Sequence, residues 1–342
     1  MGRIVLVTGV SNDLGGRVAP RIASDPQVDR VIGVDVVPPR RDLGAVRFVR
    51  ADIRNPVIAK VIAGEGVDTV VHASVVASSA QLGGRTSTKE HNVIGTMQLL
   101  AACQRAPGLE RLVVKSSAVV YGASSRDPAM FTEDMAAHQL PRGGFAKDVL
   151  EVEGYVRGFS RRRPDVTVTT IRNASPLSST VRSLLGEYLA LTPVPRVAGF
   201  DARLQLLHHD DLVAVLHHAA LAGVHGTFNA AGDGVLMLSQ MIRRLGRPAV
   251  PLPALALSSL GAMVRQARLG LPDFSPEHLP FLTYGRCLDT TRMRTTLGFQ
   301  PQRTTEAALA EYAASVQPGP LRGLPGVLAE AQVAQALGGR HG

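Results

Sequence analysis

Near its amino terminus the chain runs Ile4-Val5-Leu6-Val7-Thr8-Gly9-Val10-Ser11-Asn12-Asp13-Leu14-Gly15-Gly16, and this stretch decides the fold. Its β-branched first part predicts a buried strand, and the glycines that follow predict a tight turn into a helix. Gly9 permits the turn, and Gly15 permits close packing of the helix. Free N–H groups and the positive dipole end meet at a helix amino terminus, so the turn is suited to hold a pyrophosphate.

An acidic residue at the end of the next strand supports a dinucleotide site. Asp35 lies 26 residues after Gly9, where a carboxylate can accept both hydroxyls of an adenine ribose. It favours NAD because it would repel a 2′-phosphate, although Arg40 and Arg41 could offset that repulsion and admit NADP. The alternative is a plain turn followed by a solvated strand end. Asp52, after a third strand, would cover the adenine edge or, alternatively, cap a surface helix.

The first half of the chain alternates short β-branched runs with helical patterns, which predicts an α/β fold with a Rossmann-type, doubly wound parallel sheet. We expect strands at Ile4–Thr8, Val31–Asp35, Arg47–Val49, Thr69–Ala73, Leu112–Ser116 and Val166–Arg172. We expect helices at Leu14–Ala23, Pro56–Ile62, Lys89–Arg105 and Phe145–Ser160.

The alternation fails after Arg172, where Pro, Gly and Ser become frequent, and a strand and a helix resume near Leu204–Ala220. This predicts a smaller, discontinuous C-terminal substrate lobe over the carboxyl ends of the strands, where ligands of open α/β sheets bind. We assign residues 1–175, with about 204–235, to the cofactor domain. Residues of about 176–203 and 236–316 form the lobe, and the tail 317–342 has no assigned role.

Composition predicts a cytoplasmic protein that acts on small molecules. The two cysteines lack the spacing of a zinc site or a disulfide framework, and the start of the chain lacks a leader pattern. The uncharged stretch between Arg247 and Arg265 is broken by three prolines, so we expect no membrane span. The net charge of +9 is spread along the chain, which argues against nucleic acid and suits a phosphorylated small molecule.

Several motifs in order resemble the extended short-chain dehydrogenase/reductase superfamily, in its NAD-dependent epimerase/dehydratase branch, whose best-known member is UDP-glucose 4-epimerase. The resemblance covers about residues 1–315. Besides the opening turn and Asp35, it rests on Ala51-Asp52-Ile53-Arg54, Val70-Val71-His72-Ala73, Asn92-Val93-Ile94-Gly95-Thr96, Ser116-Ser117-Ala118-Val119-Val120-Tyr121-Gly122, Thr132-Glu133-Asp134, Lys147 with Glu151, Gln205 to Asp211, Phe228-Asn229 and Asp289 to Gly298.

The resemblance implies NAD as cofactor and a nucleotide sugar, or a related hydroxyl-bearing molecule, as substrate of a hydride transfer. It also implies a homodimer. The cofactor residues it implies are Thr8, Gly9, Asn12, Asp13, Leu14, Gly15, Asp35, Asp52, Ile53, Ala73, Ser74, Asn92, Ser116 and Lys147. Substrate contacts would come from Ser117, Ser175 and Arg203.

Two residues carry the implied catalysis. Ser117 would hold the reacting substrate oxygen. Alternatively, its hydroxyl would only form hydrogen bonds with backbone groups at the end of a strand. Lys147 would bind the nicotinamide ribose and lower the pKa of a catalytic phenol, or else be a solvated lysine of a first helical turn.

Three positions depart from the family pattern. Asn12 replaces the second glycine of the turn, although asparagine tolerates left-handed φ better than most residues. Ser175 stands where the family has a substrate-binding asparagine, with Asn173 two residues earlier. Gly143 stands four residues before Lys147, where the family's Tyr-x-x-x-Lys motif requires its tyrosine. Glycine has no side chain that could donate or accept a proton.

Other proton carriers are therefore needed, and we consider them in the order of a water held by Ser117 and Lys147, then His138, then Tyr121. Two alternatives to a sugar-nucleotide enzyme remain open. One is a non-catalytic NAD(P)(H)-binding sensor, and the other is a dehydrogenase of steroid-like or lipid alcohols, suggested by the apolar stretch near Leu252–Val264. We expect no metal, because neighbouring His208 and His209 would point to opposite faces of a strand, and we place Asp211 near the N-cap of the next helix.

Overall fold

A seven-stranded parallel sheet lies at the centre of the molecule, as the sequence predicts. The computed structural model describes residues 2–77, 84–141, 144–178, 183–257, 259 and 278–321. The strand order is β11-β6-β5-β4-β1-β2-β3, with every neighbouring pair parallel. The strands are β1 (Arg3–Thr8), β2 (Val28–Asp35), β3 (Arg47–Arg50), β4 (Thr69–His72), β5 (Arg111–Ser117), β6 (Thr167–Asn173) and β11 (Gly226–Ala230). The strand order reverses between β1 and β4, so a crevice is expected at their carboxyl ends.

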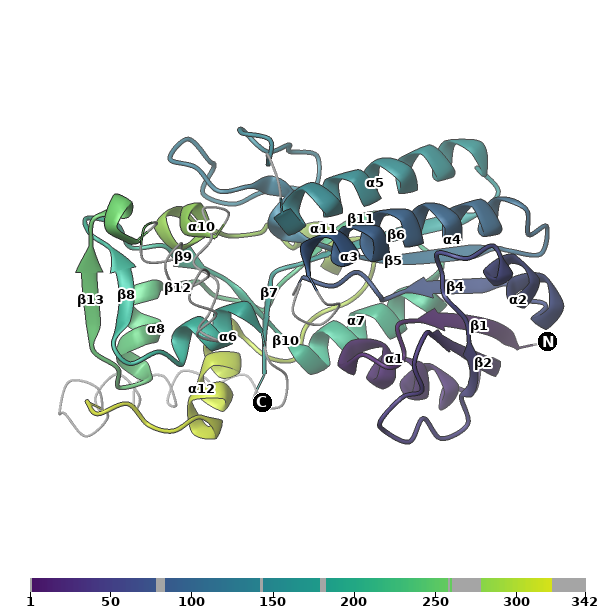
Figure 1. Cartoon of the computed structure of the whole chain (residues 1–342), viewed down its shortest axis with the longest axis horizontal. Coiled ribbons are helices and arrows are strands. Elements are labelled where there is room, and N and C mark those ends of the chain that lie inside the picture. Colours follow the sequence, from purple (N-terminus) through teal and green to yellow (C-terminus); the bar gives the residue numbers. More distant parts are fainter. Residues whose placement is uncertain are drawn as a thin grey trace.

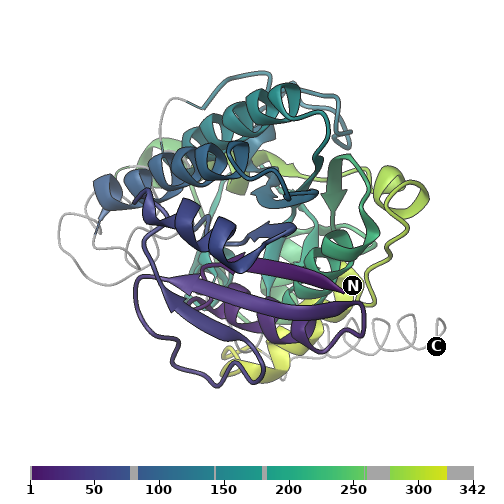
Figure 2. The same cartoon turned by 90° about the vertical axis from the view of Figure 1, so that its right-hand side faces the viewer.

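Helices cover both faces of this sheet, which confirms the doubly wound architecture (Figures 1 and 2). One face carries α1 (Asp13–Ala23) and α7 (His209–Ala222), and the other carries α2 (Val57–Glu65), α4 (Gly95–Gln104) and α5 (Gly144–Arg162). The single helix predicted over Lys89–Arg105 is continuous but irregular. It runs from α3 (Arg85–Lys89) through the π-helical turn η2 (Glu90–Ile94) into α4.

The apolar patterns explain these elements. All four residues of β4 are buried, because a central parallel strand has helices on both faces. On α5 the residues Val149, Val152, Val156 and Phe159 recur at steps of three and four, and all are buried. Burying one such side chain contributes roughly 1.5–3 kcal/mol, so this stripe fixes which face of α5 meets the sheet.

A second, smaller group of elements packs around its own cluster of buried side chains, on the left of Figure 1. One of its sheets pairs β8 (Val194–Val197) with β13 (Ala249–Leu252). The other has the order β12 (Leu236–Met237), β9 (Arg203–Leu204) and β14 (Gly285–Arg286). Its helices are α6 (Leu184–Leu189), α8 (Leu238–Arg244), α10 (Leu279–Tyr284) and α12 (Thr305–Ser315). The pair β7 (Ser175–Leu177) and β10 (Leu206–His208), the helix α11 (Thr291–Thr295) and the 3₁₀ turn η3 (Ala118–Tyr121) complete the described elements.

The connection into α7 places Asp211 near the N-cap, as the sequence predicts, in the first turn of the helix. Its carboxylate accepts hydrogen bonds from the backbone N–H groups of Gln302 and Arg303 at 2.9 and 3.0 Å. The N-cap is His208, whose Nδ1 accepts from the N–H of Asp210 at 3.2 Å. Asp211 therefore anchors a distant segment rather than the helix that bears it.

No helix in the described ranges is long and apolar enough to cross a membrane. Of the apolar stretch Leu252–Val264, the residues 258 and 260–264 lie outside the described residues, as do Gly143 and the tail from 322. The described part of that stretch includes Leu257, which is buried in the second cluster.

Candidate active site

The turn between β1 and α1 requires glycine at two positions. Gly9 has φ of +78°, and a Cβ there would lie 2.9 Å from the Cα of Ser74. A Cβ on Gly15 would lie 2.3 Å from the carbonyl oxygen of Gly9. Asn12 has φ of −81°, so this position needs no left-handed conformation, and the expected penalty for a non-glycine residue does not arise.

The amino terminus of α1 has no side-chain cap, because Asn12 makes no cap hydrogen bond. By helix geometry the amides of Asp13, Leu14 and Gly15 therefore point out of the first turn without an intrahelical partner. A compact anion at this end would accept these N–H groups and meet the positive end of the helix dipole. These features fit a dinucleotide pyrophosphate.

Asp35 stands beside this turn, at the end of β2. Its carboxylate accepts hydrogen bonds from the backbone N–H groups of Ser11 at 3.0 Å and Val36 at 2.7 Å. Arg41, considered for a 2′-phosphate, instead contacts Asp13 at 2.6 Å. Burial opposes ionisation of Asp13, yet His209, Arg17 and Arg41 hold the pKa of its carboxyl below the ordinary value. Arg41 is thus occupied, whereas Arg40 is exposed.

Asp52 is bound by its own neighbour. The Arg54 guanidinium donates to the two Asp52 oxygens at 3.0 and 2.7 Å and, with these hydrogen bonds, lowers the pKa of the carboxyl. The surface N-cap alternative for Asp52 is wrong, since α2 begins at Val57 with Pro56 in the cap position. Ile53 is buried and packs where a Cβ on Gly95 would be only 2.9 Å away.

Buried polar groups fix the segment that follows β4. His72 lies between the hydroxyls of Thr8 and Thr96, at 2.9 and 2.8 Å, and burial lowers its pKa to about 3. Asn92 exchanges two hydrogen bonds with the backbone of Val76, at 2.9 and 3.0 Å. Ala73 and Ser74, between these anchors, are buried next to the glycine turn. Asn92 therefore holds the wall of the crevice in place.

The two serines at the end of β5 have different surroundings. Ser116 donates its hydroxyl to the buried carboxylate of Glu153 on α5 at 2.5 Å, and its contact with the cofactor stays a prediction. Ser117 is buried at the last position of β5, and its Oγ accepts from the N–H of Val119 at 3.4 Å. Within the described part of the chain, no acceptor is found for the Ser117 hydroxyl hydrogen.

Asn173 is the register partner of Ser117 on β6, so their side chains leave the sheet on the same side. It is 2% exposed and its amide donates to the carbonyl of Ala174 at 2.8 Å. Its Oδ1 is buried and has no hydrogen-bond partner in the structure as described. A buried acceptor of this kind needs a donor from elsewhere, such as a substrate hydroxyl.

Helix α5 does not present the expected lysine to the site. Lys147 is exposed, on the side of the helix away from Val149, Val152 and Val156. The positions that carry the Tyr-x-x-x-Lys spacing on the buried side are Phe145 and Val149. Nothing in the structure therefore supports a catalytic function for Lys147, and neither Phe145 nor Val149 has a proton to exchange.

Tyr121 is structural. Its hydroxyl donates to Asn229 Oδ1 at 2.7 Å and accepts from Arg172 at 2.8 Å, and its ring stacks on Phe131 at 4.7 Å. It is 1% exposed, and burial raises the pKa of its phenol. With both hydrogen-bonding directions used, Tyr121 is removed from the set of proton carriers.

The sequence analysis missed Lys115. It lies two residues before Ser117 on β5, and its ammonium donates to the carbonyl of Val75, after β4, at 3.2 Å. Its Nζ lies 5.7 Å from the ring centroid of Phe145. Lys115 is partly accessible, yet protein surrounds the ammonium closely enough that burial lowers its pKa to about 8. In the sequence, the signal for Lys115 is a charged residue inside a stretch that otherwise predicts a buried strand.

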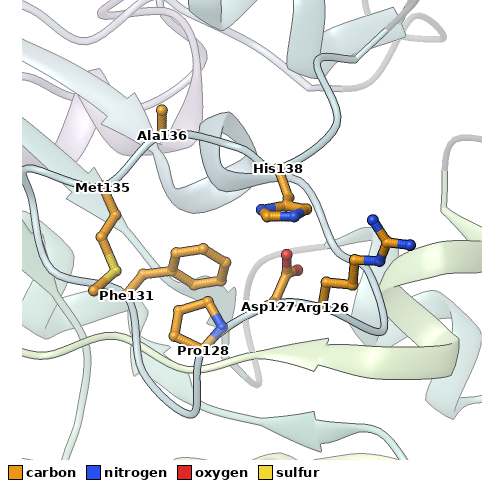
Figure 3. Close-up of a pocket in the computed structure, with 7 residues that line it drawn as sticks. All are labelled: Arg126, Asp127, Pro128, Phe131, Met135, Ala136 and His138. Atoms are coloured by element: carbon orange, nitrogen blue, oxygen red, sulfur yellow. The ribbon is translucent and has the colours of Figure 1, made fainter.

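The loop after η3 forms an open pocket of about 310 Å³ (Figure 3). The exposed side chain of His138 lies over the Asp127 carboxylate there, with Phe131 and Met135 beside them. Asp127 accepts hydrogen bonds from the N–H and hydroxyl of Ser124 at 2.6 and 2.7 Å. His138 thus lines this pocket and remains a candidate proton carrier.

Two predicted substrate residues lie on separate short strands. Ser175 begins β7, and Arg203 begins β9 and donates to the carbonyl of Ala129 at 3.4 Å. On β14, which pairs with β9, Arg286 is the register partner of Leu204. Its guanidinium donates to the carbonyl of Gly122 at 2.7 Å and lies over the Phe281 ring. Burial lowers the pKa of Arg286 to about 10. The sequence analysis did not single out Arg286.

The two histidines contact two different carboxylates rather than a shared site. His208 Nε2 lies 3.0 Å from Glu311, whereas His209 Nε2 lies 2.8 Å from Asp13. Among the residues that the structure describes, no three His, Cys, Asp or Glu side chains are grouped to hold a metal ion.

The doubly wound sheet, the uncapped helix at the glycine turn and the acid at the end of β2 define a dinucleotide-binding α/β protein. Comparison with known proteins gives the family. The model of the NAD dependent epimerase/dehydratase family matches residues 5–231, and the chain belongs to that family.

A relative in Mycobacterium tuberculosis, an uncharacterized protein, is 48% identical over 314 residues, which is 91% of this chain and 83% of the relative. Solved structures share the fold at lower identity. UDP-glucose 4-epimerase of Thermotoga maritima, with UDP-glucose, matches with a TM-score of 0.68 at 16% identity, over 91% of this chain and 98% of that one. The UDP-glucose-4-epimerase of Stenotrophomonas maltophila, with NAD and formylated UDP-arabinopyranose, matches with a TM-score of 0.69 at 18% identity, over 97% and 99%.

Proposed function

We propose that this protein is an NAD-dependent oxidoreductase of the epimerase/dehydratase kind that acts on a nucleotide sugar or a related hydroxyl-bearing substrate. The observation that carries the proposal is the uncapped amino terminus of α1 against the Gly9 turn, with the Asp35 carboxylate bonded to the same turn. Family membership supports it, and the named nucleotide sugars in the fold relatives indicate the substrate class.

In this proposal, different residues bind the cofactor and the substrate. The amides of Asp13, Leu14 and Gly15 would bind the pyrophosphate, and Asp35 would accept the adenine ribose hydroxyls. NAD would supply the hydride acceptor when bound. Ser117 and Asn173 would hold the substrate hydroxyl from two neighbouring strands, one as donor and the other as acceptor. A homodimer in the cytoplasm and the division into a cofactor domain and a substrate lobe stay predictions.

Calorimetry with NAD, NADH, NADP and NADPH tests the cofactor. We expect NAD and NADH to bind, and NADP and NADPH to bind more weakly, because Asp35 repels a 2′-phosphate and Arg41 is held by Asp13. Incubation with a panel of UDP and GDP sugars, with product analysis, tests the reaction. Absence of both binding and turnover would overturn the proposal.

One observation favours a second function, a cofactor-binding protein without turnover. The buried side of α5 carries Phe145 and Val149, neither of which exchanges a proton. This alternative predicts NAD affinity with no formation of NADH from any sugar nucleotide, and it fails if one substrate reduces bound NAD.

A further inference from the structure

The chain has only four lysines among its 37 basic residues, namely Lys60, Lys89, Lys115 and Lys147. Only lysine among the two basic types can release its proton near neutral pH, since arginine stays protonated in proteins. Lys115 is the one lysine of the four whose ammonium lies among the carboxyl ends of the central strands.

Lys115 enters this region from β5. Side chains alternate along a strand, so Lys115 and Ser117 leave β5 on the same side, the side shared by Asn173 on β6. The ammonium lies between the segment after β4 and the start of α5, because it contacts the Val75 carbonyl and the Phe145 ring. In a doubly wound sheet this end of the crevice lies beyond the pyrophosphate turn, on the side away from Asp35.

The ammonium has unused capacity there. One of its three N–H donors is used on Val75, and within the described ranges no carboxylate forms an ion pair with it. The charged groups on neighbouring elements do not neutralise it. His72 on β4 is neutral, and Asp148 on α5 is bound by Arg85 of α3 at 2.5 and 2.6 Å.

We propose that Lys115 is the site lysine of this protein, supplying from β5 the charge and the proton exchange that the family motif would place on α5. The inference rests on the proposed function. In the oxidation, the substrate C–H bond would give up its hydrogen and electron pair as a hydride, which NAD⁺ would accept when bound. The substrate O–H bond breaks, its electrons form the carbonyl, and its proton goes to the neutral Lys115 amine. Reduction returns the proton from the ammonium.

Burial also tunes this amine, since it brings the pKa of Lys115 to about 8, where both protonation states are populated near neutral pH. Lys147, exposed on α5, is the matched control because it is the lysine that the motif spacing selects.

The first experiment is a titration of the lysines. Reductive ¹³C-methylation followed by NMR gives few signals because the chain has four lysines, and Lys115→Arg and Lys147→Arg assign two of them. We expect the Lys115 signal to titrate about two pH units below the ordinary lysine value and to move when NAD is added. A Lys115 signal that titrates with the others, or that ignores saturating NAD, would overturn the inference.

The second experiment compares binding and turnover. Lys115→Met should weaken NAD at least about tenfold and stop NADH formation with the active sugar nucleotide, because a charge-assisted contact is lost. Lys115→Arg should retain most of the NAD affinity but lose turnover, while Lys147→Met should change neither. Loss of turnover with Lys147→Met and not with Lys115→Met would contradict the inference.

The two proposals fail in different ways. If the wild-type protein binds no dinucleotide, the proposed function fails. If it binds NAD while the Lys115 signal and the Lys115→Met affinity stay unchanged, only the assignment of Lys115 fails.

Discussion

Glu153 on α5 and Arg172 on β6 form a buried ion pair. Both are almost fully buried, and the guanidinium donates to the two carboxylate oxygens at 2.9 and 2.7 Å. Glu153→Gln leaves a buried cation without its counterion, so we expect a loss of about 3–5 kcal/mol in the free energy of unfolding, measured with urea. Ser116→Ala is the control, because it removes one hydrogen bond to the same carboxylate and should cost only about 1 kcal/mol. Equal losses would show that the ion pair adds nothing.

Lys115 should leave a signature in the pH dependence of stability, even without cofactor. Its folded pKa of about 8 lies below the ordinary lysine value of 10.5, so between these values the unfolded chain binds more protons and stability rises with pH. The buried charge therefore destabilises the folded protein in full below pH 8.

Lys115→Met should accordingly stabilise the protein at about pH 7, and the gain should shrink at about pH 10. Urea unfolding at both pH values measures the gain, with Lys147→Met, at an exposed lysine, as the comparison. A gain that is independent of pH would mean that the Lys115 ammonium is not strained by burial.

At the scale of elements, the turn into α1 separates two substitutions that look alike in the sequence. Gly15→Ala places a Cβ 2.3 Å from the Gly9 carbonyl, so α1 must move and NAD affinity should fall at least about tenfold. Asn12→Gly restores the family glycine but relieves no backbone strain, since φ is already −81°. We expect it to change stability by only a few tenths of a kcal/mol, as for other exchanges at an N-cap. Calorimetry and urea unfolding check both, and a large gain of NAD affinity in Asn12→Gly would show that the side chain obstructs the pyrophosphate.

The main sheet could be predicted from the sequence because its strands and helices follow local periodicity, and each predicted element is present within a few residues. Helix α5 shows the limit of matching a motif by its letters. Lys147 fits the family spacing, but the apolar stripe from Phe145 and Val149 onward already indicates that Lys147 faces outward. Asn173 and Lys115 were not predicted as site residues because their positions depend on register between strands, which a local pattern does not encode.

At the scale of the whole molecule, the segment around β14 packs against a loop that is far away in the sequence. Residues of β14 and the segment after it return to the loop beyond η3, where Phe131 exchanges backbone hydrogen bonds of 2.9 Å with Cys287 and Asp289. No local sequence pattern predicts these contacts, because they join residues more than 150 positions apart. Arg286 lies in this junction, half-buried and bonded to the Gly122 carbonyl.

Arg286 makes no ion pair with a carboxylate in the ranges that the structure describes, although Asp127 is close enough to favour its charge. A half-buried guanidinium at the junction of the two groups of elements can bind the diphosphate of a sugar nucleotide through paired N–H donors. We expect Arg286→Met to raise the KM for the active sugar nucleotide at least about tenfold while the Kd for NAD stays unchanged. Arg203→Met is the comparison, because Arg203 is exposed on the paired strand and should matter less. If Arg203→Met raises the KM and Arg286→Met does not, the substrate contact lies at Arg203, and Arg286 only fastens the junction.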